Sequence, residues 1–158
     1  MSDQLPTELS TFQISVGRGE LKACEAALLS GKANINGVSN IYNLSPIQIA
    51  ARKGNEKMCR LLLQHGAQIS STSLCWPQPA FFMALRNGHL GVCQLLLDNG
   101  VCINTTDPRG NHTPLYIAVY YGYHAIVEEL LKRGANVTNE MELANEQILC
   151  IFKRYGYT

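Results

Sequence analysis

The sequence predicts an all-α protein assembled from repeated helix–turn–helix units, and three observations support this prediction. Glycines recur in two series whose members lie 34 or 35 residues apart. Each pair of glycines encloses a short amphipathic segment, and a second helical stretch precedes the pair. The first series is Gly19, Gly54, Gly88 and Gly122, and the second is Gly31, Gly66, Gly100 and Gly134. Because one helical pair cannot cover its own apolar face, we expect the units to stack on one another.

The segments between paired glycines predict the second helix of each unit. They read ELKACEAALLS (20–30), NEKMCRLLLQH (55–65), HLGVCQLLLDN (89–99) and YHAIVEELLKR (123–133). Their apolar residues recur at spacings of three and four, which is the period of one helical face. A glycine directly after each segment is a helix-ending signal, because glycine adopts the left-handed conformation without strain at a Cβ atom.

A first helix is predicted before each glycine of the first series. The clearest examples are SPIQIAARKG (45–54), PAFFMALRNG (79–88) and TPLYIAVYYG (113–122). Pro46 and Pro114 suit the first helical turn, where a missing N–H costs little, and Ser45 and Thr113 suit the cap. A small residue recurs where two helices must approach closely, and it is Ala50, Ala84 or Ala118.

These motifs resemble the ankyrin repeat. The stretch NHTPLYIAVYYGYHAIVEELLKRGANV (111–137) is similar to the pattern T-P-L-H-x-A-A-x-x-G-H followed by a spacer, L-L and G-A, and residues 45–69 match almost as well. The third unit has Pro79-Ala80 in place of Thr-Pro, and the first unit lacks this signature and carries one extra residue. Divergence of the first unit is expected, because a terminal repeat has one face in water.

The resemblance implies an ankyrin-type solenoid of stacked repeats with β-hairpin-like loops. We expect an N-terminal tail over 1–9 and four repeats over 10–138, at about 10–40, 41–74, 75–108 and 109–138. Residues 139–158 are interpreted as a C-terminal capping helix, or a truncated capping repeat. This helix would carry the apolar residues Ile148, Leu149, Ile151 and Phe152, and its KRYG sequence (153–156) is similar to KRG in the fourth unit.

Cysteine positions indicate core packing rather than metal binding. Cys24, Cys59 and Cys93 share one repeat position, where the fourth repeat has Val127. Since valine replaces cysteine there, we expect the position to be buried and apolar. The remaining cysteines are Cys75, Cys102 and Cys150, and none has a CxxC partner or a histidine at metal-ligand spacing. We therefore expect no metal and no cofactor.

Length, composition and motifs favour a soluble binding protein over an enzyme. The chain has 158 residues, 46% hydrophobic and 16% charged, with a formal net charge of +1, which gives no overall attraction to nucleic acid or to an acidic membrane. No signal peptide, transmembrane run, nucleophile motif or phosphate loop is present in the sequence. We expect a monomeric cytoplasmic protein, with the nucleus as a second location, unless the sequence is a piece of a longer chain.

The resemblance implies binding through loop tips and first helices, which line a concave face in ankyrin proteins. By position, the residues around the first-series glycines should face this concavity, and the exposed Arg and Lys side chains could equally be merely solvated. The residues at these positions form a basic ridge that leads to an aromatic group. The ridge is Arg18, Arg52, Lys53 and Arg86, and the aromatic group is Tyr120, Tyr121 and Tyr123. Adjacent Tyr120 and Tyr121 cannot both face the core of one short helix, so at least one should be exposed. We expect a partner protein with an acidic patch that also accepts aromatic side chains.

The predicted loop tips add four candidate contacts. They are Tyr42, Trp76, Arg109 and His112. The loop STSLCWPQPA (71–80) departs from the usual D-x-x-G turn, whereas DPRG (107–110) keeps it. Trp76 is either an exposed anchor or a side chain packed onto the neighbouring loop, and the sequence leaves both alternatives open.

The sequence therefore predicts a protein–protein interaction module, an adaptor or an inhibitor. The alternative is a substrate-recruiting ankyrin domain of a larger protein, such as a ubiquitin ligase receptor, which requires the chain to be a fragment. Because the family resemblance transmits the scaffold and not the partner, the variable surface positions must decide between them.

Overall fold

The structure of the chain is a computed structural model. It describes residues 11–38, 44–69, 79–107 and 112–157. Within these ranges every regular element is a helix, as the sequence predicted. The chain forms two compact units, residues 1–80 and residues 81–158.

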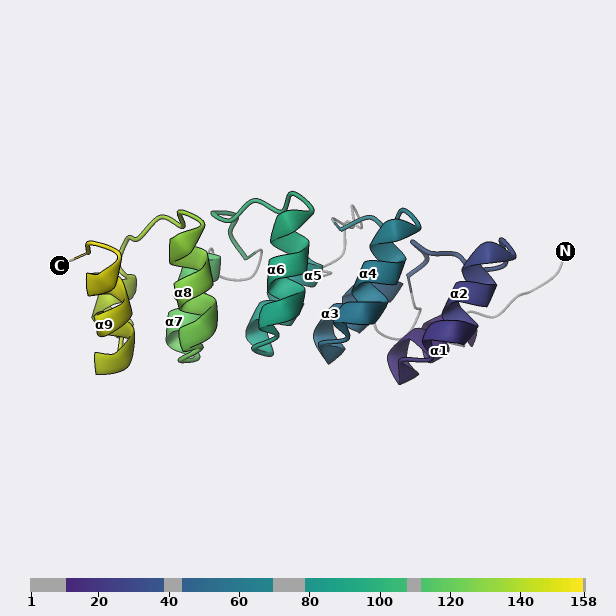
Figure 1. The fold of residues 1–158 in the computed structure, drawn as a ribbon, viewed down its shortest axis with the longest axis horizontal. Coiled ribbons are helices and arrows are strands. Elements are labelled where there is room, and N and C mark those ends of the chain that lie inside the picture. The colour runs from purple at the N-terminus through teal and green to yellow at the C-terminus, as the bar shows by residue number, and fades with distance from the viewer. Residues whose placement is uncertain (1–10, 39–43, 70–78, 108–111, 158) are drawn as a thin grey trace, which may run out of the picture. The chain divides into compact units, whose positions relative to one another are not determined.

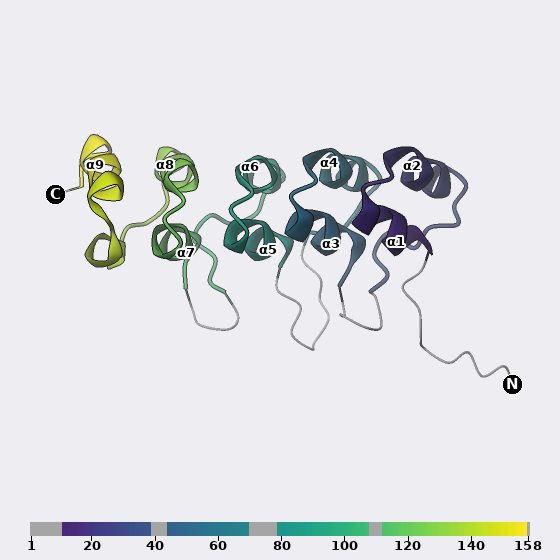
Figure 2. The ribbon, with the colours of Figure 1, turned by 90° about the horizontal axis from the view of Figure 1, so that it is seen from below.

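The first unit contains two helical hairpins. Their helices are α1 (Thr11–Arg18), α2 (Leu21–Leu29), α3 (Pro46–Lys53) and α4 (Glu56–Gln64). Helix α1 packs against α2 and α3, and α4 packs against α3 and α2 (Figure 1). Figure 2 shows two layers in this unit, α1 with α3 and α2 with α4. This layering is the stacking that the glycine periodicity predicted.

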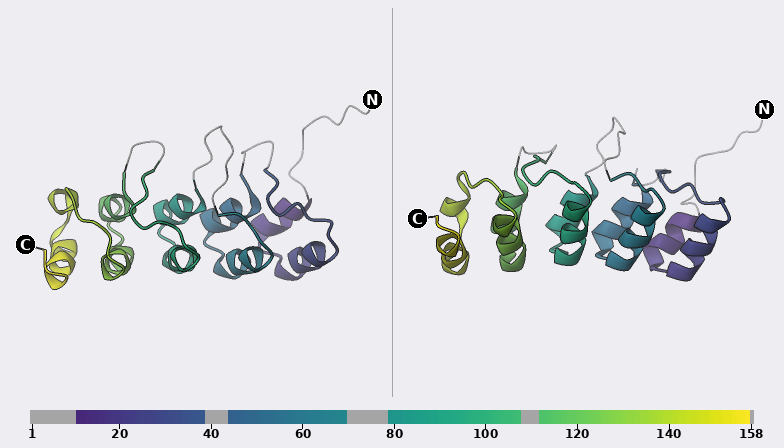
Figure 3. Two further views of the ribbon diagram at one scale, coloured as in Figure 1. Left: turned by 90° about the horizontal axis from the view of Figure 1, so that it is seen from above. Right: turned by 45° about the horizontal axis from the view of Figure 1, so that its top comes forward.

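The second unit contains two further hairpins and a shorter final pair. Its helices are α5 (Ala80–Arg86), α6 (Leu90–Asp98), α7 (Pro114–Tyr120), α8 (His124–Lys132), the 3-10 helix η1 (Glu140–Leu143) and α9 (Glu146–Arg154). Within this unit α8 packs against α6, α7 and α9, and α7 also packs against η1. Figures 2 and 3 show the described segment after α6 turning outward on the side of α5 and α7.

The predicted turn glycines have the required conformation. All eight glycines of the two series have φ between +68° and +89°. At Gly54 the following N–H of Asn55 donates to the Ala50 carbonyl at 3.1 Å, and at Gly122 the N–H of Tyr123 donates to the Ala118 carbonyl at 2.9 Å. These bonds satisfy carbonyls that a helix end leaves without a partner. The recurring alanine therefore serves both the close helix contact and the turn.

The repeated core positions are buried as predicted. Cys24, Cys59 and Cys93 are at most 1% exposed, and Val127 at the same position is 0% exposed. Burial raises the pKa of the Cys59 and Cys93 thiols to about 12. Both thiols are therefore protonated at neutral pH and pack as small apolar groups.

The predicted side-chain cap is present at Thr113 of α7, whereas at α3 the Ser45 hydroxyl makes no cap hydrogen bond. The Thr113 hydroxyl accepts a hydrogen bond from Tyr116 N–H at 3.0 Å. At Ser45 the backbone N–H donates to the Gln48 side-chain oxygen at 2.7 Å. Pro46 and Pro114 lie in the first turn, where the prolyl ring removes no helical hydrogen bond.

In the C-terminal segment the 3-10 helix η1 precedes the last helix, α9. The buried carboxylate of Glu140 in η1 accepts a hydrogen bond from the Thr113 hydroxyl at 2.9 Å, which ties η1 to the start of α7. Asn145 caps α9 by accepting from Ile148 N–H at 2.9 Å. The apolar face of α9 is buried through Ile148, Ile151 and Phe152, whereas Leu149 is only half-buried.

Candidate functional site

The two tyrosines at the end of α7 are both exposed. Tyr120 is 65% exposed and Tyr121 is 46% exposed. The buried face of α7 consists of Pro114, Leu115, Ile117, Ala118 and Val119. Because these residues already fill the contacts of α7 with its neighbours, the rings of its last turn remain in solvent. The prediction that at least one of the pair is exposed is confirmed.

These two rings belong to an array of five aromatic side chains, which we call the tyrosine cluster. It consists of His112, Tyr116, Tyr120, Tyr121 and Tyr123. The rings of His112 and Tyr116 stack at 4.3 Å between centroids, and those of Tyr116 and Tyr120 lie nearly parallel at 6.3 Å. Spacing by four residues places Tyr116 and Tyr120 on one edge of α7, and His112 directly precedes the N-cap residue Thr113.

The remaining members of the tyrosine cluster turn the array through a corner. The Tyr121 ring stands at 86° to the Tyr120 ring, with 5.2 Å between centroids. Tyr123 then lies nearly parallel to Tyr121 at 5.7 Å. Edge-to-face and offset parallel arrangements at these distances are favourable for aromatic rings. The cluster therefore supports its exposed members through ring contacts within the same unit.

Tyr123 anchors the cluster to the preceding helical hairpin. Its hydroxyl donates to the Arg86 carbonyl at 3.1 Å. Its ring lies over the turn after α5, where a Cβ atom added at Gly88 would be 2.9 Å from Tyr123 Cε1. Tyr123 was predicted as a contact for a partner, and the structure shows that this half-buried side chain also holds the unit together.

Arg86 forms an ion pair inside the second unit. Its guanidinium donates to the carboxylate of Asp107, which is fully buried, while the Arg86 side chain itself is 28% exposed. The backbone N–H of Asp107 donates to the His112 carbonyl at 2.9 Å. The charge of Arg86, predicted as part of a basic ridge, is therefore compensated locally.

A hollow of about 390 Å³ lies beside the tyrosine cluster. Its lining is Arg86, His112, Tyr116, Ile117, Tyr120 and Tyr121. Ile117 is only 3% exposed, and Tyr120 and Tyr121 are the most exposed residues of the lining. The hollow thus combines aromatic faces, an apolar residue and one compensated ion pair.

At the ends of α1 and α3 the first unit presents cations, whereas the second unit presents tyrosines at the end of α7. Arg52 and Lys53 are exposed in the last turn of α3, where positive charge favours the negative end of the helix dipole. Arg18 is exposed at the end of α1, and its guanidinium lies 3.8 Å from the Glu20 carboxylate. An exposed pair of this kind contributes at most about 1 kcal/mol. These side chains remain predicted partner contacts.

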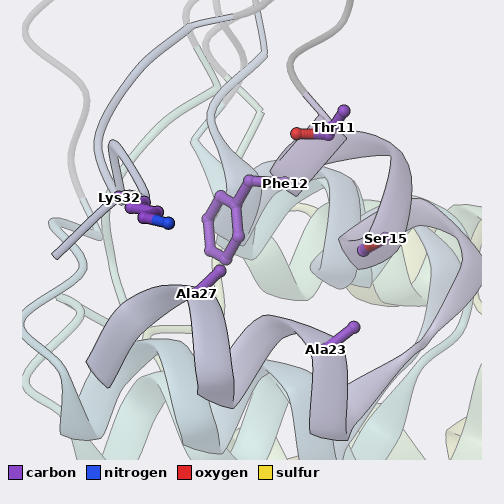
Figure 4. A pocket seen from close by; sticks show the side chains of 6 residues that line it. All are labelled: Thr11, Phe12, Ser15, Ala23, Ala27 and Lys32. Carbon is purple, nitrogen blue, oxygen red and sulfur yellow. The ribbon is translucent and has the colours of Figure 1, made fainter. Parts of the chain in front are cut away.

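A second hollow, of about 250 Å³, lies in the first repeat between α1 and α2. Its lining is Thr11, Phe12, Ser15, Ala23, Ala27 and Lys32. Figure 4 shows the Phe12 ring pointing toward Ala27, with Lys32 at one side. The lining of this hollow, which no sequence motif indicated, contains one aromatic ring and one cation.

Tyr42, Trp76 and Arg109 lie outside the described residues, so their predicted roles stay predictions. Two residues that matter in the second unit were not identified from the sequence. Tyr116 could have been found from its spacing, because it precedes Tyr120 by four residues. Asp107 carries a weaker signal, since an aspartate that opens a turn is common.

The described part of the chain contains no group of three or more His, Cys, Asp or Glu residues arranged to hold a metal ion. Within the same residues, none of the helices is both long enough and apolar enough to cross a membrane.

Comparison with known proteins identifies the repeats in both units. A family model described as ankyrin repeats (many copies) matches residues 12–63, and one described as ankyrin repeats (3 copies) matches residues 70–141. Among solved structures, the crystal structure of the human ASB11 ankyrin repeat domain is similar, with a TM-score of 0.82 and 25% sequence identity. The match covers 100% of this chain and 75% of that chain. No curated protein sequence matches.

Proposed function

Because the chain belongs to the ankyrin repeat family, whose repeats are in general protein–protein interaction modules, we propose that it binds a partner protein as an adaptor or inhibitor. The ankyrin fold is an interaction scaffold and is not typically catalytic. We place the contacts at the ends of the first helices and at the loops beside them. We also propose that the protein acts as a monomer in the cytoplasm, with the nucleus as a second location.

The single observation that carries this proposal is the exposure of Tyr120 and Tyr121 on a supported aromatic array. Tyrosine gives a large contact area with a polar tip, and it is enriched among residues that dominate binding energy. Only two side-chain torsions must be fixed when a tyrosine contacts a partner. Because neighbouring rings already restrict both side chains, little further ordering is required on binding.

The cations of the first unit suggest the charge of the partner. Arg18, Arg52 and Lys53 are exposed, and we propose that they face an acidic patch. Surface charges of this kind mainly accelerate association and select among partners. The tyrosine cluster would then supply most of the affinity.

A second candidate function is substrate recruitment within a larger protein, such as a ubiquitin ligase receptor. The observation that favours it is the likeness to the human ASB11 ankyrin repeat domain, of which this chain covers 75%. The natural transcript separates the candidates. A stop codon directly after the codon for Thr158 favours the adaptor or inhibitor, and an open frame into a further domain favours recruitment.

Capture of partner proteins from a lysate of the native host tests the proposed surface. The test variant is Tyr120→Ala/Tyr121→Ala, and the matched control is Leu29→Ala, which removes another exposed apolar side chain (73% exposed). We expect the control to retain the partner and the double variant to lose affinity by about 2 kcal/mol or more. Circular dichroism checks that both variants remain folded. Unchanged affinity in a folded double variant excludes this surface.

A further inference from the structure

We propose that the hollow beside the tyrosine cluster binds a proline-rich, extended segment of the partner in the polyproline II conformation. This inference rests on the proposed function and specifies the chemistry of the segment that is bound. Aromatic-lined grooves are a recurrent way of binding such segments, because polyproline II is already ordered before it binds. Three features of the hollow favour this occupant.

The first feature is the length of the ring array. His112, Tyr116 and Tyr120 form a row of nearly parallel rings, with steps of 4.3 Å and 6.3 Å between centroids. A polyproline II helix presents the same face every three residues, a rise of ~9 Å. The row is therefore about as long as one turn of this helix, so prolines at positions i and i+3 can contact its two ends. The Tyr121 ring, which stands at 86° to the Tyr120 ring, adds an aromatic side chain in a second orientation at one end of the row.

The second feature is charge. Aromatic faces also attract lysine and arginine side chains, so a cation is the main competing occupant. Here Arg86 lines the same hollow, and within the described residues its guanidinium is paired with the buried Asp107. The lining thus contains one cationic residue and no carboxylate, so a second cation would meet charge repulsion without an acidic partner. A proline ring is uncharged and meets no such repulsion.

The third feature is hydrogen bonding. A proline-rich segment has carbonyl acceptors and few N–H donors, because proline lacks the backbone N–H. The cluster brings tyrosine hydroxyls, which can donate to carbonyls. Of the four hydroxyls, that of Tyr123 already donates to Arg86, whereas within the described residues those of Tyr116, Tyr120 and Tyr121 contact no protein acceptor. Hydroxyl donors next to ring faces are thus matched to a ligand of carbonyl acceptors and apolar rings.

The hollow is also held in shape before binding. Tyr123 joins the cluster to Arg86, Arg86 pairs with Asp107, and Asp107 bonds the backbone of His112. The described sides of the hollow are therefore linked by contacts within one unit. Such preorganisation reduces the entropy lost on binding, which matters for a short peptide with few contacts.

Titration of the isotope-labelled full chain with synthetic peptides, followed by NMR, tests this proposal. The probe is an acetylated peptide of about ten prolines, and the controls are a glycine–serine peptide and a lysine-containing glycine–serine peptide of the same length. We expect saturable shifts of amide resonances in α7 and its following turn with oligoproline alone. Absence of shifts, or equal or tighter binding of the lysine peptide, overturns the proposal.

Two variants at one position then assign the contact. We expect Tyr120→Ala to weaken oligoproline binding by about tenfold and Tyr120→Phe, which keeps the ring, to weaken it by less than about threefold. Equal binding by wild type and Tyr120→Ala overturns the proposal. Suppose instead that Tyr120→Ala/Tyr121→Ala loses the captured partner while oligoproline neither binds nor competes with it. The proline inference then fails and the proposed function stands.

Discussion

Arg52 and Arg86 occupy the same repeat position, two residues before a turn glycine, but the two units use them differently. Arg52 is exposed at the end of α3, whereas Arg86 is half-buried and its guanidinium pairs with the buried carboxylate of Asp107. The residue 34 positions before Asp107 is Ser73, so the sequence repeats the arginine without repeating the acid. An identical residue at an identical helical position can therefore serve the surface in one repeat and the framework in another.

The other residues just before the turn glycines also differ between the two units. In the first unit Lys53 follows Arg52 and extends the positive surface, while in the second unit the last turn of α7 carries Tyr120 and Tyr121. The turns themselves are alike, because Gly54 and Gly122 both have φ of +72°. The scaffold thus depends on the glycine, alanine and core positions. The positions just before each turn glycine differ from repeat to repeat.

The largest effect is expected at the ion pair. Asp107→Ala should lower the free energy of unfolding by about 2–4 kcal/mol, because it leaves Arg86 without its buried partner. This estimate lies toward the low end for buried pairs, since Arg86 is partly solvated. Arg52→Ala, a change at the equivalent and exposed arginine of the first unit, should cost less, because no buried charge is left behind. Urea denaturation measures both, and equal losses would remove the distinction between the two arginines.

The next effect concerns how the two units contribute to binding. Tyr120→Ala should weaken binding of the partner by about 2 kcal/mol, mainly through faster dissociation, because a central apolar contact is lost. Arg52→Ala/Lys53→Ala should mainly slow association, and the difference from wild type should shrink as salt is raised. Surface plasmon resonance at two ionic strengths resolves the rates. A salt-independent loss in the double variant would contradict an electrostatic role for the first unit.

How far the sequence determines these features depends on the range of the contact. The turn glycines, the buried cysteine position and the exposure of the tyrosine pair follow from local spacing, and all were predicted correctly. The Arg86–Asp107 pair joins residues 21 apart, and the Tyr123 hydroxyl bonds a carbonyl 37 residues away. Periodicity places each side chain on a helix, but it does not identify a partner contributed by a loop or by the next repeat. Arg86 therefore resembled a free surface cation in the sequence.

A smaller effect is expected from alkaline pH, at the core position that both units share. Burial, with a lesser contribution from the Glu56 carboxylate, raises the pKa of Cys59 to about 12, and burial raises that of Cys93 to about 12. Below the unfolded pKa, near 9, both states are protonated and the contribution is fully present. Between about pH 9 and 12 only the unfolded thiol ionises, so stability falls as pH rises, by about 1.4 kcal/mol per pH unit and thiol.

Substitution isolates this contribution. Cys59→Val/Cys93→Val should lose less stability than wild type between pH 9 and 10.5, because the variant has no ionisable group at either position. Urea denaturation at each pH measures the difference, and tyrosine and lysine ionisation cancels in the comparison. Parallel pH profiles for wild type and variant would show that these thiols do not retain their protons in the folded state.

The smallest effect is expected from one cysteine at neutral pH. Cys59→Val should change the free energy of unfolding by less than about 1 kcal/mol, because Val127 already fills the equivalent position in the second unit with 0% exposure. The reciprocal variant Val127→Cys, which removes apolar volume, should cost more than Cys59→Val. Thermal unfolding of both variants completes the comparison of the units. A loss of several kcal/mol in Cys59→Val alone would mean that the two cores are packed differently, although their turns and repeat positions are the same.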